Sequence, residues 1–216
     1  MSYPIDMLGI LADVTVLIPS RWNRGEWRDR ALRSVEEQTI GKVPTLVVIG
    51  LGKHEAYNQA MNVDTEFVAI LDDDDYMLPN HLETLVAAQL ESDADVVWSM
   101  IEVTDGTNSV RWAADYIPDR LDDFNFMYNG YMFRSSLLRE YGGHSGDGLS
   151  DWKFWIWARD RGAKFKAANP PEPTLVVNIH EGNLMMRPNV IDALKQFNES
   201  PPPVGFQRAP FLEEAR

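Results

Sequence analysis

Three short apolar runs, each followed by a segment with helical spacing, constrain the fold of this chain more than any other feature. Buried strands are predicted from their β-branched and apolar residues at 14–18, 45–49 and 66–71. Helices are predicted after these strands at 26–38, 53–61 and 79–90. This alternation predicts an α/β fold with a parallel, Rossmann-like central sheet flanked by helices. In such a sheet, ligands bind at the carboxyl ends of the strands, near a topological switch point.

The second half of the chain is less regular. Further strands are predicted at 95–103, 108–113, 130–133 and 175–179, and further helices at 134–141 and 151–161. The glycine-rich residues 142–148 form either a mobile lid or a surface loop. There is no internal repeat and no dividing linker in the 216 residues, so residues 1–200 are expected to form one domain and the proline-rich residues 201–216 a tail.

The composition excludes several classes of protein. A formal net charge of −13 argues against non-specific nucleic-acid binding, so nucleic acid is not expected as a partner. The absence of cysteine excludes disulfides and thiolate metal sites. No apolar run approaches the roughly 20 residues that span a bilayer, and residues 1–12 lack the features of a signal peptide. We therefore expect a cytoplasmic protein without stable membrane insertion.

Four consecutive aspartates, Asp72 to Asp75, close the third predicted strand. Two carboxylates in close contact repel each other by about 4 kcal/mol at an effective dielectric constant of about 20. A hard divalent cation held by oxygen ligands would offset this repulsion, and Mg²⁺ or Mn²⁺ commonly bridges carboxylates to phosphates. The alternative is an acidic loop that caps the following helix, because aspartate is a favoured N-cap residue.

Three blocks of the sequence carry a resemblance to a known family. They comprise residues 16–20 with Asn23 and Arg24, residues 71–75 with Leu78 and Pro79, and residues 131–134 with Gly142, Gly143, Asp151 and Trp152. In this order and spacing, the blocks resemble the family 2 glycosyltransferases, a nucleotide-sugar-dependent group with the GT-A fold. The resemblance extends over residues 13–182. It implies a mostly parallel central sheet with a smaller acceptor-side portion.

The chain departs from the family pattern at three places. Gly50-Leu51-Gly52 stands where the family often has an acidic pair that contacts the nucleotide base, so base recognition must differ. Ser150-Asp151 replaces the usual Glu-Asp pair before the acceptor-side helix. The Q-x-x-R-W signature of processive synthases is absent, which favours a non-processive enzyme. A UDP-sugar is the donor that the family favours, although the sequence does not specify the nucleotide.

The resemblance implies a metal site and a general base. Asp74 would contact Mn²⁺ or Mg²⁺, Asp72 would contact the metal or the donor ribose, and His180 would complete the coordination or contact the phosphates. Asp151 would take the proton of the acceptor hydroxyl, which implies inversion at the anomeric carbon. Structural alternatives remain open. A carboxylate in the first turn of a helix interacts well with the helix dipole, and a histidine at a strand end is often a satisfied structural group.

Further side chains are expected to contact the donor and the acceptor. The donor-binding candidates are Pro19, Ser20, Arg21, Arg24, Lys53, Asn58, Asp72 and Asp73. The acceptor-binding candidates are Trp98, Trp152 and Trp155. Arginine can hold a phosphate through two parallel hydrogen bonds, but Arg21 and Arg24 could equally be a solvated helix entry. The tryptophans could stack on a sugar or base, or pack in the core, and Asn58 could cap or pack a short helix.

These expectations combine into a metal-dependent, hexosyltransferase-like glycosyltransferase. Its acceptor would be a hydroxyl group of a glycan, a protein or another molecule. A nucleotidyltransferase is one alternative, but residues 19–23 are not the glycine-rich phosphate loop that such an enzyme normally shows. The other alternative is a non-catalytic protein that binds sugar nucleotides or carbohydrates on the same fold. Slow hydrolysis of the donor would distinguish an enzyme from a binding protein.

Overall fold

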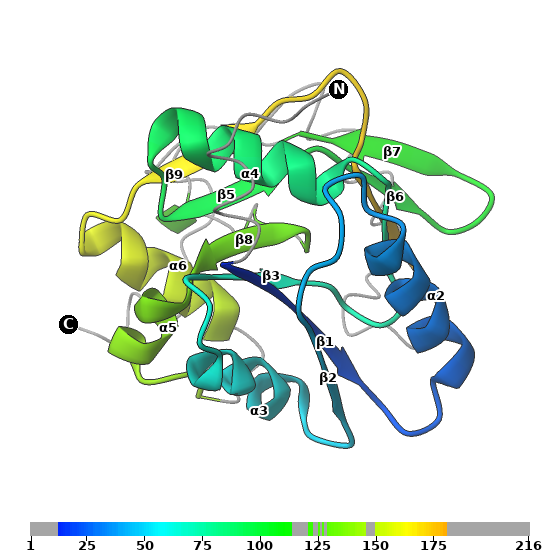
Figure 1. The fold of residues 1–216 in the computed structure, drawn as a ribbon, viewed down its shortest axis with the longest axis horizontal. Helices are drawn as coiled ribbons and strands as arrows, with labels where there is room; N and C mark the ends of the chain where they lie inside the picture. The colour runs from blue at the N-terminus through cyan, green and yellow to red at the C-terminus, as the bar shows by residue number, and fades with distance from the viewer. Residues whose placement is uncertain are drawn as a thin grey trace.

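A six-stranded sheet forms the centre of the protein (Figure 1). The computed structural model describes residues 13–113, 121–122, 125, 127, 129–145 and 150–180. In spatial order, the strands are β2 (Thr45–Ile49), β1 (Val14–Ser20), β3 (Phe67–Ile70), β8 (Tyr131–Arg134), β5 (Val96–Ser99) and β9 (Phe165–Ala168). The predicted tail at 201–216 lies outside the described residues, as does the 146–148 part of the predicted lid or loop.

The direction of the strands decides which residues meet at the edge of this sheet. β1 is parallel to both β2 and β3, and β5 is parallel to β9. β8 is antiparallel to β3 and β5, between which it lies. The predicted mostly parallel sheet is thus confirmed, with one reversed strand. Because Ala69 pairs with Met132, the residues just before β8 lie beside those that follow β3.

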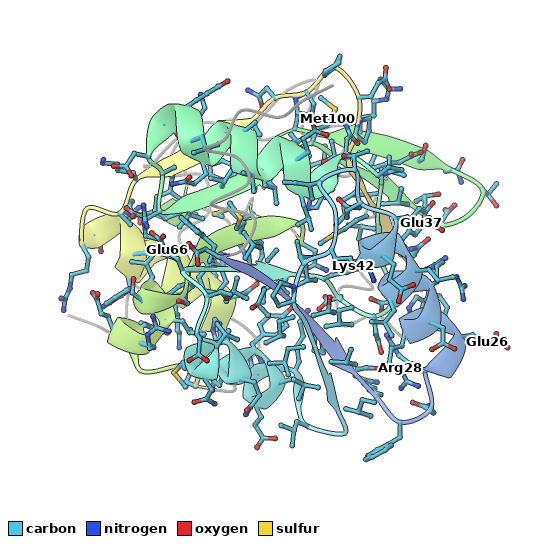
Figure 2. The ribbon with its side chains drawn as sticks, viewed as in Figure 1. Glu26, Arg28, Glu37, Lys42, Glu66 and Met100 are labelled. Carbon is cyan, nitrogen blue, oxygen red and sulfur yellow. The ribbon has the colours of Figure 1, made fainter. Side chains whose placement is uncertain are left out.

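Five helices pack around the sheet in the described part of the chain. They are α2 (Gly25–Glu36), α3 (Lys53–Asn58), α4 (His81–Ser92), α5 (Ser135–Tyr141) and α6 (Ser150–Asp160). The helix predicted at 53–61 is confirmed as α3 followed by a 3₁₀ turn, Gln59–Asn62. α2 turns Ala31 and Val35 into the core, whereas Glu26 points away from it (Figure 2). None of the described helices is long and apolar enough to cross a membrane.

A second sheet of four strands lies beside the first. Its order is β4 (Tyr76–Met77), β10 (Leu175–Asn178), β6 (Ile101–Thr104) and β7 (Ser109–Trp112). The predicted single strand at 95–103 is wrong, because it divides at Met100 into β5 of the first sheet and β6 of the second (Figure 2). β6 and β7 pair antiparallel as a hairpin, and β7 confirms the strand predicted at 108–113. The short strands β4 and β9 were not predicted.

The core lies between the first sheet and its helices. Every residue of β1 is buried, and α2 and α3 both contact this strand. On the other side of β3, aromatic rings fill the space between β8 and α6. Phe133 and Phe154 meet edge to face at 5.5 Å between ring centroids, and Tyr131 meets Trp155 in the same way at 4.8 Å. This packing holds the middle of α6 against β8.

Candidate functional site

The four aspartates form one of the connections between the two sheets. They follow β3 of the first sheet and lead directly into β4 of the second. Asp73, Asp74 and Asp75 are buried, and Asp72 is partly buried. One carboxylate oxygen from each of Asp72, Asp74 and Asp75 lies within 4.8 Å of the other two. Three converging carboxylates are the hard oxygen ligands that Mg²⁺ and Mn²⁺ prefer, so the residues present fit a divalent cation.

Asp72 is held by three donors from different elements. Lys53 Nζ and Asn129 Nδ2 both donate to its Oδ2 at 2.7 Å, and the Tyr57 hydroxyl donates to its Oδ1 at 2.7 Å. Burial by itself would raise the pKa of Asp72, but Lys53 and these hydrogen bonds bring it below its ordinary value. Burial acts to lower the pKa of Lys53, but the nearby carboxylates, Asp72 foremost, raise it. Both members of the pair are therefore charged at neutral pH.

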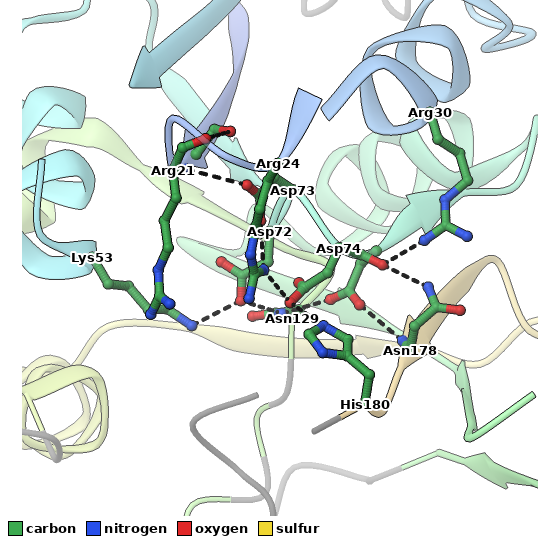
Figure 3. A network of polar contacts seen from close by, with 12 residues as sticks. Arg21, Arg24, Arg30, Lys53, Asp72, Asp73, Asp74, Asn129, Asn178 and His180 are labelled. Atoms are coloured by element: carbon green, nitrogen blue, oxygen red, sulfur yellow. Dashed lines mark hydrogen bonds and ion pairs between the residues drawn. The ribbon is translucent and has the colours of Figure 1, made fainter. Parts of the chain in front are cut away.

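Arg24 bridges the next two aspartates. Its Nη1 lies 2.9 Å from Asp73 Oδ1 and 2.6 Å from Asp74 Oδ2 (Figure 3). Although burial acts to lower the pKa of Arg24, the hydrogen bonds and charges of the two carboxylates raise it. His180 Nε2 lies 3.1 Å from the same Asp74 Oδ2, and its ring packs on Trp27 with centroids 4.5 Å apart. The Asp74 carboxylate is thus shared by an arginine and a histidine.

Two asparagines fix the remaining aspartate. Asn129 Nδ2 donates to Asp75 Oδ2 at 2.8 Å while also donating to Asp72, so one amide group joins two carboxylates. The backbone N–H of Asn178 donates to Asp75 Oδ1 at 2.9 Å, and its side chain donates to the Asp74 carbonyl at 2.7 Å. Burial, followed by the charges of Asp72 and Asp74, raises the pKa of Asp75 well above its ordinary value. The asparagines stabilise a cluster that would otherwise repel itself.

Asp151 lies in the first turn of α6, within electrostatic reach of this cluster. Its Oδ2 accepts a hydrogen bond from Asn125 Nδ2 at 3.2 Å, and its Oδ1 accepts one from the backbone N–H of Trp152 at 2.8 Å. After burial, the charge of Asp151 is the next cause that raises the pKa of Tyr131. Against the lowering effect of burial, it also acts to raise the pKa of Lys53, with a smaller effect than Asp72. This half-buried carboxylate thus lies close enough to Lys53 and Tyr131 to affect the pKa of both.

The structure brings half of the predicted site residues together. The side chains or backbone groups that meet at the cluster are those of Arg21, Arg24, Lys53, Asp72, Asp73, Asp74 and His180 (Figure 3). Arg21 takes part through its backbone N–H, which donates to Asp73 Oδ2 at 3.3 Å. Pro19 and Ser20 are the buried last residues of β1, and the Ser20 hydroxyl donates to the Arg21 carbonyl. Their contribution is to position the turn that carries Arg21 and Arg24.

Other predicted residues lie apart from the cluster. The side chain of Asn58 exchanges two hydrogen bonds with the backbone of His144, so it holds the start of the glycine-rich segment, in line with a packing role. Trp98 and Trp155 are core residues, and Trp155 is only 1% exposed. The Trp152 indole is also buried and donates to the Leu121 carbonyl at 2.6 Å. All three rings occupy the packing positions that were the alternative to stacking on an acceptor.

Four residues that contact the aspartates were not predicted. They are Tyr57, Asn129, Asn178 and Arg30, the last of which donates to the Asp74 carbonyl at 2.6 Å. Asn178 is the last residue of β10, which is the same signal that pointed to the aspartates, whereas Asn129 precedes β8. Trp22 was not predicted as a site residue either. Its side chain is 80% exposed and lies against Gly50, where an added Cβ would be 2.2 Å from the Trp22 Nε1. It lies at the ends of β1 and β2.

The sheet and the acidic edge together define a GT-A glycosyltransferase fold. Residues 48–148 match the model of glycosyl transferase family 2, which confirms the resemblance, and the matched segment holds all four aspartates and Asn129. No curated protein matches the chain.

Solved structures of other proteins share the fold. TarS 1-349 of S. aureus in complex with UDP is 15% identical, with a TM-score of 0.62 over 77% of this chain and 60% of that one. TarS 1-349 in complex with UDP-GlcNAc is 16% identical, with a TM-score of 0.60 over 79% and 60%. The mannosyltransferase PcManGT of Pyrobaculum calidifontis in complex with GDP-Man and Mn²⁺ is 17% identical, with a TM-score of 0.55 over 79% and 58%. The chain thus spans about 60% of the length of the first of these structures.

Proposed function

We propose that this protein is a metal-dependent glycosyltransferase that moves a sugar, of the hexose class, from a nucleotide-sugar donor to an acceptor hydroxyl. The observation that carries this proposal is the convergence of Asp72, Asp74 and Asp75 with two cationic side chains, Arg24 and Lys53. Carboxylates and cations at one strand edge suit a metal-bound diphosphate, since the metal needs the former and the phosphates need the latter. The reaction is proposed to be inverting and non-processive.

The metal would be held by Asp72 and Asp74, with Asp75 and His180 adjoining. When bound, Mn²⁺ or Mg²⁺ would supply Lewis-acid stabilisation of the negative charge on the departing diphosphate. Arg24 is suited to the phosphates because its planar guanidinium presents several N–H donors at once. Lys53 approaches from α3 and adds a second positive charge at the same edge. Neutralising the leaving group in this way lowers the barrier to its departure.

Asp151 is proposed as the general base. An acceptor hydroxyl is a poor nucleophile until it loses its proton, and a carboxylate within hydrogen-bond reach can take that proton during attack. Direct attack on the anomeric carbon, opposite the departing diphosphate, inverts its configuration. The proposal is supported by the half-buried position of Asp151 and by its electrostatic effect on Tyr131 and Lys53 near Asp72.

A UDP-sugar is the proposed donor. The family resemblance favours it, and the TarS structures of similar fold hold UDP and UDP-GlcNAc, while PcManGT holds GDP-Man with Mn²⁺. Trp22 would give the base an exposed ring to stack on, in place of the acidic pair that is missing at 50–52. The acceptor is proposed to be a glycan, protein or other hydroxyl compound. A cytoplasmic location remains a prediction from the sequence.

A thermal-shift panel tests the donor and the metal together. UDP-, GDP-, dTDP- and CDP-sugars are each added with Mn²⁺, with Mg²⁺ and with EDTA. A ligand at a hundred times its dissociation constant stabilises the folded state by about 2.7 kcal/mol. We expect a rise in melting temperature only for one nucleotide class in the presence of metal. If the melting temperature does not rise in any combination, the proposal is contradicted, and a protein without this catalytic activity is favoured.

Replacement of the proposed base tests catalysis. In Asp151→Asn, transfer should fall by about a hundredfold or more, because the proton acceptor is lost, while donor affinity changes little. Asp160→Asn is the matched control, because it makes the same chemical change at an exposed residue at the other end of α6. Asp160 pairs with Arg159, and transfer should not change. Donor hydrolysis measured without acceptor separates an enzyme from a binding protein. Full turnover by Asp151→Asn would show that Asp151 is not the base.

A further inference from the structure

Arg24 and Lys53 occupy the oxygen atoms that a divalent ion would need. Arg24 Nη1 is 2.6 Å from Asp74 Oδ2, and Lys53 Nζ is 2.7 Å from Asp72 Oδ2. Mg²⁺ binds its ligands at about 2.0–2.1 Å in near-octahedral geometry, so it requires free lone pairs on these oxygens. An ammonium or guanidinium group this close would also repel the ion. The two side chains and the metal therefore compete for the same carboxylates.

We propose that Arg24 and Lys53 are internal counter-ions that leave the aspartates when a divalent ion binds and then pair with the diphosphate of the donor. This inference rests on the proposed function and adds a coupling between the two ligands. Metal alone has to break two ion pairs without offering the cations a new partner. Metal with a diphosphate offers that partner, so each ligand strengthens the binding of the other by the same factor.

The surroundings of the two cations favour such an exchange. The Lys53 side chain is 38% exposed and reaches the cluster from the first turn of α3. Arg24 is 15% exposed and is the N-cap residue of α2, where its side chain makes no capping hydrogen bond. Because both long side chains emerge from element ends beside the cluster, they can turn toward a phosphate without movement of the sheet.

Three other donors at the cluster have a different role. Asn129 and Asn178 are neutral, and Arg30 contacts only the backbone carbonyl of Asp74 among the acidic run. These groups hold the positions of the carboxylates whether or not a metal is present. A neutral amide does not compete with a cation by charge repulsion. The site thus has fixed polar supports together with two exchangeable positive charges.

Binding of Mn²⁺ alone, without nucleotide, provides the test. Titrations followed by the electron paramagnetic resonance of free Mn²⁺ compare the wild type with Arg24→Gln and Lys53→Gln. Each substitution removes one competing cation, so Mn²⁺ affinity should rise by about tenfold. Arg33→Gln, at an exposed position in the last turn of α2, makes the same change in net charge and should stay within about twofold of the wild type.

A second titration measures the coupling with UDP as the probe. In the wild type, saturating Mn²⁺ should increase UDP affinity strongly. In Arg24→Gln this increase should fall by about tenfold, because the released guanidinium is no longer there to bind the diphosphate. The variant therefore gains affinity for one ligand and loses it for the other. A purely structural role of Arg24 would weaken both.

Two results of the Mn²⁺ titration would overturn the proposal. It fails if folded Arg24→Gln and Lys53→Gln bind Mn²⁺ no more tightly than Arg33→Gln, or if no form of the protein binds Mn²⁺. Circular dichroism checks folding, and Lys53→Gln decides alone if the less exposed Arg24 cannot be replaced. If UDP binds to none of the proteins, the proposed donor is wrong, but the Mn²⁺ titration still decides the counter-ion role. Failure of the two proposals is therefore distinguishable.

Discussion

His81, the first residue of α4, is a buried and neutral imidazole whose protonation should oppose folding. Burial lowers its pKa from 6.5 to about 3, and the side chain is fully buried. Its Nδ1 lies 2.8 Å from Thr174 Oγ1. The ring also faces Gly130, where a Cβ would come within 3.2 Å of Cε1. Gly130 directly precedes β8 and follows Asn129, which donates to Asp72. The packing of His81 against Gly130 therefore helps to position Asn129 at the acidic cluster.

The sign and the size of the effect follow from the two pKa values. The pKa is lower in the folded state, so the unfolded state binds more protons and stability falls as the pH is lowered. The contribution is complete above pH 6.5 and is lost progressively as the pH falls toward about 3. Each pH unit in this window costs about 1.4 kcal/mol of unfolding free energy. Between pH 7 and pH 5, this single residue should therefore remove about 2 kcal/mol.

Urea denaturation of the wild type and His81→Gln at pH 7, 6 and 5 measures this loss. Glutamine does not titrate and keeps a polar group toward Thr174, so its unfolding free energy should depend less on pH. The carboxylates that titrate in this range are common to both proteins and cancel in the difference. The wild type should lose about 2 kcal/mol more than the variant between pH 7 and pH 5. Equal losses would refute a neutral, buried His81 in the folded state.

Two further substitutions probe the loop start and the exposed tryptophan. Gly143→Ala should cost about 1–2 kcal/mol more unfolding free energy than Gly142→Ala, as measured by denaturation. Both glycines have positive φ, but only at Gly143 would a Cβ come within 2.9 Å of Asn58 Oδ1. Equal costs would mean that the Asn58 contact does not matter. Trp22→Ala should change stability by less than about 0.5 kcal/mol yet weaken UDP binding by about threefold to tenfold in calorimetry. Unchanged UDP affinity would remove Trp22 from the nucleoside pocket.

The strand edges at the site could be predicted because they depend on local patterns. The runs at 14–18 and 45–49 are apolar, β-branched and bounded by proline or glycine, and the structure forms β1 and β2 there. The aspartates after β3 were found in the same way. Parallel packing of such strands then places their carboxyl ends at one edge, which is why Arg24 and Lys53 could be expected near Asp72.

What could not be predicted depends on contacts between distant segments. Nothing in residues 130–133 indicates that β8 runs against β3, and this reversal is what brings Asn129 to Asp72 and Asp75. The division at Met100 is equally hidden, since only this residue separates β5 from β6 and the two strands join different sheets. Tryptophans suit a buried core as well as a sugar-binding wall, so burial alone distinguishes the two.

The segment between β3 and β4 is short, and this limits the insertions that the protein can tolerate there. Surface loops usually absorb insertions, because their ends tolerate small displacements. Here one end is fixed by β3 in the first sheet and the other by the pairing of Tyr76 and Met77 with β10 in the second. An extra residue among the aspartates would either expel a carboxylate from the cluster or slip β4 by one position against β10. The spacing of the acidic run is thus set jointly by both sheets.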